Sequence, residues 1–170
     1  MRGARQEGRL QAREATSAHP QQMGDQMKEN PKDLKVIAQQ FFAAYDAHNV
    51  DGMTALCAAD ARGWYVPYGR ESAGPIRGGI DAIWRAFPQV VTDFRVEVVE
   101  MMLAEGSTVV ALALVGGPMP GPDPLGITEK GQRVMLPHVF ILRFAADAKI
   151  ARVDAYWDNA ALQGIKASTL

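Results

Sequence analysis

His138 is the residue of this sequence best suited to move a proton. It lies in a segment in which every second residue is apolar: Val134, Leu136, Phe140, Leu142 and Phe144. Because the side chains of a β-strand alternate between its two faces, His138 shares the apolar face of this segment. A neutral imidazole can relay a proton near pH 7, which is what enolisation chemistry needs. We therefore predict that His138 is a catalytic residue in a pocket. The alternative is a core histidine bonded to a backbone carbonyl or to water.

Tyr65 is the second candidate, because a phenol can donate a hydrogen bond to a carbonyl or enolate oxygen. Tyr65 and Tyr68 flank Pro67 in a stretch that we expect at the mouth of the pocket. The alternative for each is a packed aromatic ring whose hydroxyl reaches water. Stabilisation of an oxyanion by Tyr65, with His138 moving the proton, is the mechanism that these residue types suggest.

Two carboxylates lie in or after the last predicted strand. Asp158 could serve as a catalytic base, or it could cap a helical turn over 159–165, a role for which Asp is a favoured residue. The sequence favours the capping role for Asp158. Asp154 we expect to pair with Arg143 of the adjacent strand as an ion pair on the surface of the sheet.

The composition excludes several classes of function. The 170 residues include 18 Lys+Arg and 19 Asp+Glu, whereas nucleic-acid-binding domains are usually strongly basic. A single cysteine, Cys57, excludes a disulfide framework, and the histidines at 19, 48 and 138 have no metal-ligand spacing. No apolar run approaches the roughly 20 residues of a membrane span. We therefore expect a cytoplasmic protein with no metal, cofactor, nucleic-acid partner or membrane partner.

Three helices are predicted in the first half of the domain. Apolar residues at three- and four-residue spacing predict a helix that begins at Pro31 and ends near His48, and a second short helix begins at Asp51. A short strand over 62–66 follows. A third helix over 79–87 is expected to end before Pro88. Its predicted inward-facing residues are Ile80, Ile83, Trp84 and Phe87.

Beyond residue 94 the apolar period changes from that of a helix to that of a strand. Strands are predicted over 94–103, 108–115, 132–144 and 150–157, with a bulge near Val98-Val99, where the apolar phase slips. The proline-rich segment 116–126 is predicted as a hairpin loop. It could shape the pocket mouth through Met119 and Leu125, or it could be a plain connector.

These elements predict an α+β fold with one domain. Residues 1–30 carry almost no large apolar side chain, so we expect a disordered tail followed by a domain over 31–170. The sequence leaves open whether the tail is translated, since Met23 or Met27 could be the true start. A curved antiparallel sheet with helices on its concave side forms a cone, and the open end of that cone is a pocket.

Three motifs resemble one known family, in the right order and spacing. The first is the run from Phe41 to Asp51, which is similar to the first helix of the family and the turn after it. The second is Ile76-Arg77-Gly78-Gly79-Ile80-Asp81-Ala82-Ile83, and the third runs from Lys149 to Asp158. Together they resemble the nuclear transport factor two-like superfamily, and most closely its SnoaL-like polyketide cyclase and ketosteroid-isomerase-like members. The resemblance implies a one-domain cone, often a dimer through the sheet, with an apolar pocket.

The resemblance also assigns positions to the expected pocket. Three positions that carry acidic or phenolic groups in isomerase-like and cyclase-like members fall here on Phe41, Phe140 and Ala155, and the isomerase base falls near Tyr65. Isomerase chemistry of the ketosteroid type is therefore not expected. The expected pocket-lining residues are Phe41, Tyr45, Trp84, Phe140, Ala155 and Trp157.

Two functions remain open from the sequence. One is binding of a small, largely apolar molecule with acid/base chemistry of isomerase or cyclase type, through His138, Tyr65 and Asp158. The other is a non-catalytic ligand-binding or dimerisation module. We expect a homodimer in either case, because the long strands need a covered face.

Overall fold

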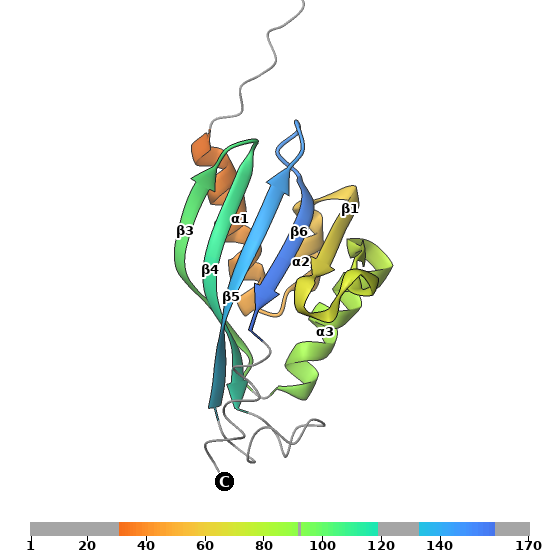
Figure 1. Cartoon of the computed structure of the whole chain (residues 1–170), viewed down its shortest axis with the longest axis vertical. Coiled ribbons are helices and arrows are strands. Elements are labelled where there is room, and N and C mark those ends of the chain that lie inside the picture. The colour runs from red at the N-terminus through yellow and green to blue at the C-terminus, as the bar shows by residue number, and fades with distance from the viewer. Residues whose placement is uncertain (1–30, 92, 119–132, 159–170) are drawn as a thin grey trace, which may run out of the picture.

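The computed structural model describes residues 31–91, 93–118 and 133–158 (Figure 1). The predicted tail over 1–30, the turn over 159–165 and the part of the predicted loop from Met119 onward lie outside the described residues. Within them, three helices and a six-stranded sheet form one α+β unit. The α+β architecture predicted above, with helices packed on a curved sheet, is therefore confirmed, although the sheet stays open and does not close into a barrel.

Helix α1 begins at the predicted residue, α2 begins one residue before the predicted Asp51, and α3 begins two residues after the predicted Gly79. Helix α1 spans Pro31–Asp46 and α2 spans Val50–Ala55. Asn49 caps α2, because its side-chain oxygen accepts a hydrogen bond of 2.9 Å from the backbone N–H of Gly52. Two short turns, η1 (Val66–Tyr68) and η2 (Arg70–Ser72), and a wider turn, η3 (Ile76–Ile80), lead into helix α3.

Helix α3 corrects two predictions. It spans Asp81–Val90 and contains Pro88 rather than ending before it. Pro88 lies in the last turn, where it removes one N–H, and the helix still closes with a hydrogen bond of 2.8 Å from Val91 N–H to the Phe87 carbonyl. Ile83 was predicted to face inward, but it is exposed, because the buried side of α3 centres on Trp84.

The sheet has the strand order β2-β1-β6-β5-β4-β3. Its strands are β1 (Cys57–Tyr65), β2 (Gly74–Pro75), β3 (Arg95–Ala104), β4 (Thr108–Pro118), β5 (Arg133–Phe144) and β6 (Ile150–Trp157). All neighbouring strands are antiparallel except β1 and β6, which run parallel, so the predicted antiparallel sheet is in fact mixed. The predicted bulge is confirmed by a register shift between Val98 and Glu100.

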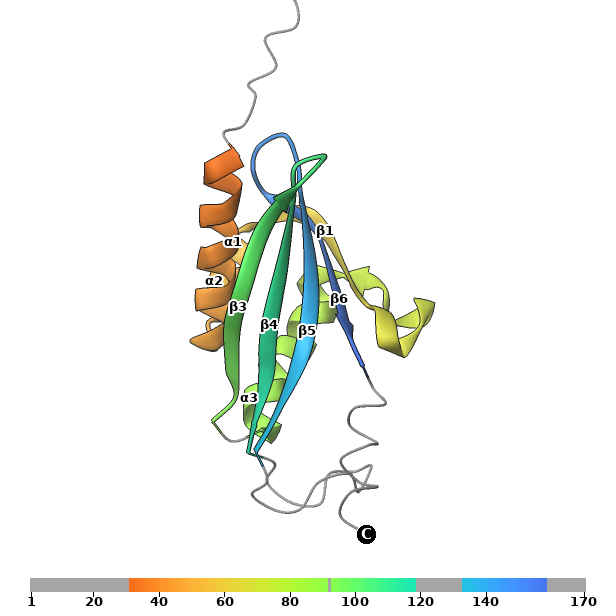
Figure 2. The same ribbon diagram turned by 60° about the vertical axis from the view of Figure 1, so that its left-hand side comes forward.

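The sheet has a concave face under the helices and a convex face turned away from them. Figures 1 and 2 show the strands as a strongly twisted layer with α1 packed across one side. Along β4, Val109, Ala111, Ala113 and Val115 are buried, and the residues between them are only half-buried. The buried set faces the helices, so Leu112 and Leu114 belong to the convex face. Pairing then places Phe140, Ala155, His138 and Trp157 on the concave side.

Strand β4 continues through residues that we predicted as loop. Gly116, Gly117 and Pro118 pair with β5 rather than turning away from it. Gly116 makes this possible with a φ of +151°, and a Cβ at this position would lie 1.9 Å from the Val134 carbonyl oxygen. The close approach of the two backbones therefore depends on glycine. Strand β1 is likewise longer than predicted, since it begins at Cys57 instead of Arg62.

Candidate functional site

The interior of the cone is filled by aromatic side chains. Phe41 and Tyr45 of α1 pack against Trp84 of α3, with ring centroids 5.6 and 6.2 Å apart, and Phe42 packs edge-on against Phe140 at 5.2 Å. Of these five side chains, none is more than 4% exposed. Edge-to-face pairs of this kind add about 0.5–1.5 kcal/mol each beyond area burial. The expected pocket-lining residues thus converge, but they pack on one another.

A chain of three polar side chains crosses this interior. The Tyr65 hydroxyl lies near both the Trp84 indole and the Tyr45 hydroxyl, and each of these neighbours influences the pKa of Tyr65. Burial raises the pKa of both phenols well above their ordinary value of 10.0. The three residues come from β1, α3 and α1. The chain ties these elements together and keeps both phenols neutral.

His138 lies farther along the concave face, where β6 ends. Its cross-strand partner is Trp157, the last residue of β6, and the two rings stack with centroids 5.1 Å apart. The imidazole also packs nearly parallel to the Phe140 ring, at 5.6 Å. Trp157 makes edge contacts with Tyr65 at 5.6 Å and with Tyr68 at 5.2 Å. We call the group His138, Trp157, Tyr65 and Tyr68 the mouth cluster.

The protonation of His138 follows from its contacts. Its Nδ1 lies 2.9 Å from the Leu136 carbonyl oxygen. A carbonyl only accepts, so Nδ1 carries the hydrogen, and in the neutral ring the lone pair is on Nε2. Burial lowers the pKa of the imidazole below its ordinary value of 6.5, against the opposing effect of the Leu136 hydrogen bond. His138 is therefore neutral at pH 7 and presents an acceptor at Nε2.

Trp157 lies between the two predicted catalytic residues. It contacts His138 on one side of the mouth cluster and Tyr65 on the other. The Tyr65 side chain is buried and its hydroxyl lies near Tyr45 and Trp84, whereas Tyr68 is 56% exposed. The structure thus places His138 and Tyr65 in one cluster. The His138 imidazole lies between aromatic rings at the end of β6, whereas the Tyr65 hydroxyl lies deeper, near Tyr45 and Trp84.

A second concave feature lies on the opposite face of the sheet. This outer groove, of about 650 Å³, runs along the middle strands on the convex side. It is lined by Val99, Leu112, Leu114, Pro137, Val139, Tyr156 and Asp158, with Ala113, His138 and Trp157 between them along the strands. Asp158 is exposed at its border, apart from Tyr65 and Tyr45. Capping by Asp158 would involve residues outside the described part of the chain.

The predicted ion pair between Asp154 and Arg143 is confirmed. Asp154 is 1% exposed, although it faces the convex side, because two arginines cover it. Arg143 Nη1 lies 2.5 Å from one carboxylate oxygen and Arg152 Nε 2.7 Å from the other. The Arg152 guanidinium also lies over the Trp64 ring, at 5.9 Å from its centroid. This cluster is structural, and its carboxylate is fully engaged.

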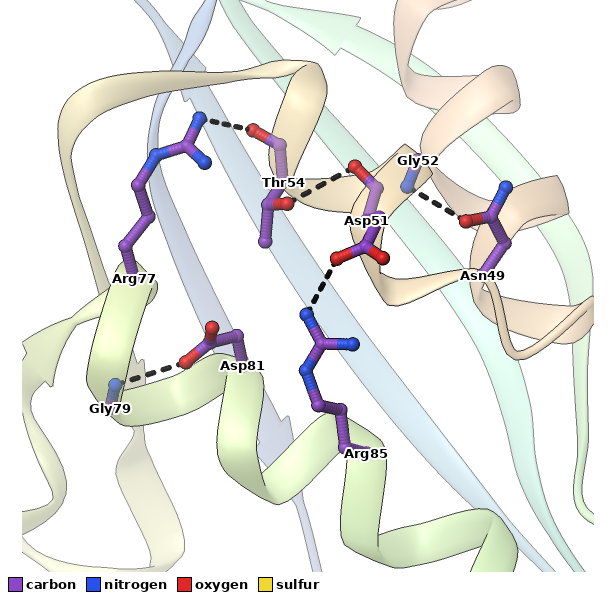
Figure 3. A network of polar contacts seen from close by, with 8 residues as sticks. All are labelled: Asn49, Asp51, Gly52, Thr54, Arg77, Gly79, Asp81 and Arg85. Atoms are coloured by element: carbon purple, nitrogen blue, oxygen red, sulfur yellow. Dashed lines mark hydrogen bonds and ion pairs between the residues drawn. The ribbon is translucent and has the colours of Figure 1, made fainter.

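Sequence reasoning missed the polar contacts that fix α3 against α2. Figure 3 shows the Arg77 guanidinium donating to the Thr54 carbonyl at 2.8 Å, where α2 ends, and Arg85 paired with Asp51 at 2.7 Å. Arg77 belongs to the second motif quoted above. That motif marked Arg77 as a residue of interest but did not indicate that it binds the Thr54 carbonyl. These contacts orient α3, and with it the Trp84 side chain.

Other kinds of site find no support in the described residues. No group of three or more His, Cys, Asp or Glu side chains in the described ranges could hold a metal ion. Burial raises the pKa of the Cys57 thiol to about 11, and its Sγ donates to the Met53 carbonyl, so it is a poor nucleophile. Over the same ranges, no helix is long and apolar enough to cross a membrane.

Several solved structures share this fold. AclR from Streptomyces galilaeus is 18% identical with a TM-score of 0.65, covering 80% of this chain and 86% of that one. A protein from Catenulispora acidiphila with a ketosteroid isomerase-like fold was solved with trimethylamine. It is 19% identical with a TM-score of 0.62, and the match covers 77% of this chain and 92% of that one. SalBIII, an epoxide hydrolase/cyclase-like enzyme of pyran ring formation in the polyether salinomycin, is 14% identical with a TM-score of 0.63, covering 77% and 95%.

The family is established by the sequence itself. No curated protein matches the chain. A model of the SnoaL-like domain, however, matches residues 38–153, which run from the middle of α1 into β6. The three motifs that suggested this family all overlap that range. The chain therefore belongs to the SnoaL-like family.

Proposed function

We propose that the protein binds a small, largely apolar molecule at the mouth cluster and carries out acid/base chemistry there, of isomerase or cyclase type. His138 is the residue that moves the proton. The observation that carries this proposal is the fixed imidazole, with Nδ1–H held by the Leu136 carbonyl and Nε2 left as a base. Aromatic and apolar surroundings with one oriented polar group are typical of small-molecule sites.

The location at the mouth, rather than deep in the cone, follows from packing. Phe41, Phe140 and Ala155 are nearly inaccessible and leave no acidic group in the interior. The half-buried Trp157 and the exposed Tyr68 offer aromatic surface beside His138. In this proposal Tyr65 acts through its contacts with Trp157 and Tyr45. Donation from Tyr65 to a substrate oxygen would require its hydroxyl to leave that chain.

A homodimer through the convex face is the second part of the proposal. That face carries Val99, which is 64% exposed, and the apolar lining of the outer groove. An antiparallel sheet can leave one face to water when that face is polar, whereas exposed apolar side chains on such a face favour a partner. The cytoplasmic location and the absence of nucleic-acid and membrane partners stay predictions from the sequence.

The alternative is a non-catalytic binding or dimerisation module. It is favoured by the same filled positions, Phe41, Phe140 and Ala155, because they replace groups that related enzymes use. It differs from the first proposal in one respect, since a binding module has no use for a base at His138.

The test is a screen for binding and turnover that compares the native protein with one variant. Apolar fragments are titrated by calorimetry, and ligands that bind are incubated with enzyme in deuterated water, so that mass spectrometry detects hydrogen exchange at acidic positions. We expect exchange with the native protein and a loss of at least about 100-fold in His138→Gln, typical of a lost general base. Binding with equal exchange in both proteins would favour the binding module. No binding of any fragment would overturn both.

A further inference from the structure

We infer that the mouth cluster selects aromatic or other planar ligands that carry a hydroxyl group, and that this hydroxyl donates its hydrogen bond to Nε2 of His138. This inference rests on the proposed function and names the class of ligand for the same site. It predicts that a phenol or enol is preferred over its ether or its parent hydrocarbon.

The first step is the direction of the hydrogen bond. Nδ1 of His138 is committed to the Leu136 carbonyl at 2.9 Å, and a carbonyl has no hydrogen to give. The neutral ring has one N–H, so Nε2 can only accept. A ligand group at Nε2 must therefore be a donor. A carbonyl or ether oxygen placed there would meet a lone pair.

The second step is that Nε2 is accessible. No side-chain nitrogen or oxygen in the described part of the chain is both buried and without a partner. Nε2 makes no hydrogen bond to a described residue, whereas Nδ1 does. Nε2 is therefore not sealed from solvent by the described residues. A ligand that covers it without donating would strip its water and give nothing in return, at a cost of about 1–3 kcal/mol.

The third step is the shape of the ligand. The faces of the imidazole are in stacking contact with Trp157 and Phe140, with interplanar angles of 27° and 14°. Tyr68 meets Trp157 edge-on and is exposed, so its ring forms the rim of the cluster. A flat π-system can extend this set of rings and place its own edge against the imidazole edge. A hydroxyl on that edge then reaches Nε2.

The experiment compares three probes of nearly equal size by titration calorimetry. They are 2-naphthol, 2-methoxynaphthalene and naphthalene, measured at pH 7.5 with the full chain. We expect 2-naphthol to bind about tenfold more tightly than the other two, as one satisfied hydrogen bond predicts. Equal affinities of the three probes would overturn the inference.

Two variants of His138 separate the ring nitrogens. In His138→Asn the amide reaches the Nδ1 position and can still donate to Leu136, but nothing replaces Nε2. In His138→Gln the amide reaches the Nε2 position. We expect the preference for 2-naphthol to vanish in His138→Asn and to persist in part in His138→Gln. A preference that survives unchanged in His138→Asn would contradict the assignment to Nε2. Circular dichroism reports whether each variant is folded.

A second pair of variants locates the probes and separates this inference from the proposed function. Trp157→Phe should weaken all three probes alike, whereas Tyr156→Leu, on the convex face, should weaken none. If the probes bind with dependence on Trp157 but without preference for the hydroxyl, only the inference fails. If binding depends on Tyr156 instead, or no probe binds, the site itself is misplaced and the proposed function fails with it.

Discussion

At the scale of single residues, the chemistry of this protein depends on which atoms are already engaged. The Tyr65 hydroxyl is buried near Tyr45 and Trp84, and the Asp154 carboxylate is bonded to two arginines. His138 differs from both, because only one of its two nitrogens is bonded within the described structure. The sequence predicted the face on which His138 lies. It could not predict the tautomer, which depends on the backbone of Leu136.

Burial of His138 makes the stability of the fold depend on pH. Its pKa in the folded state lies below the 6.5 of an exposed histidine, so the unfolded chain binds the proton more readily. The free energy of unfolding should therefore fall as the pH drops below about 6.5, by at most about 1.4 kcal/mol per pH unit for one proton. The fall ends below the folded-state pKa.

The measurement is urea unfolding between pH 7.5 and pH 5, in the native protein and in His138→Asn. The variant should lose the part of the slope that belongs to this histidine, because its amide does not titrate. His48 remains in both proteins as an internal control. An equal slope in the two proteins would show that His138 is as easily protonated in the fold as in the unfolded chain.

At the scale of elements, the sequence predicted those that repeat a clear period. Strand β6 and helix α1 begin where the pattern places them, and the bulge in β3 follows from one slip of the apolar phase. The predictions failed where local rules were overridden by packing. Cys57 to Ala61 has small residues without alternation, yet β1 begins at Cys57, which pairs with Ile150 before a register shift that ends at Arg62, and Pro88 is tolerated in the last turn of α3.

The Tyr45, Tyr65 and Trp84 chain was also beyond the reach of the sequence. Each residue is predicted for the pocket or its mouth, but their mutual proximity joins three elements that only the tertiary fold brings together. Periodicity tells which face of an element a residue occupies. It does not tell which polar atoms meet across the core.

The continuation of β4 through Gly116 predicts a sensitive position. In Gly116→Ala the new Cβ would collide with the Val134 carbonyl oxygen, and the φ of +151° is strained for any residue with a side chain. We expect a loss of about 2–4 kcal/mol in the free energy of unfolding, measured with urea. The pairing of β4 with β5 near the mouth should loosen at the same time.

A second glycine provides the control. Gly106 lies in the turn between β3 and β4 with a φ of +65°, and a Cβ there would meet nothing within 4 Å. Asn adopts this conformation readily, so Gly106→Asn should change stability little. Hydrogen exchange should show faster exchange around Gly117 and Val134 in Gly116→Ala only. Native-like stability of Gly116→Ala would contradict the close approach of the two strands.

At the scale of the whole molecule, the two faces of the sheet have different partners. The concave face is covered by the helices, and the convex face carries apolar residues with no such cover: Val99, Met102, Leu112, Leu114, Val139 and Tyr156. Exposed apolar patches on this scale mark interfaces. The outer groove is thus better explained as part of a contact between two copies than as a second ligand site. The proposed small-molecule site is then the mouth cluster.

The proposed homodimer predicts the mass of the protein in solution and the effect of one substitution on that mass. Sedimentation should give twice the 18.5 kDa of one chain at micromolar concentration. Leu114 lies on the convex face of an inner strand and lines the outer groove, so Leu114→Glu would place a charge in the apolar contact of each copy. We expect this variant to sediment as a monomer.

Val36→Glu, on the exposed side of α1, places the same charge far from the sheet and should stay dimeric. A native protein of single-chain mass would remove the dimer, and a dimer that persists in Leu114→Glu would place the contact on another face. In either case the outer groove would again be a candidate ligand-binding site.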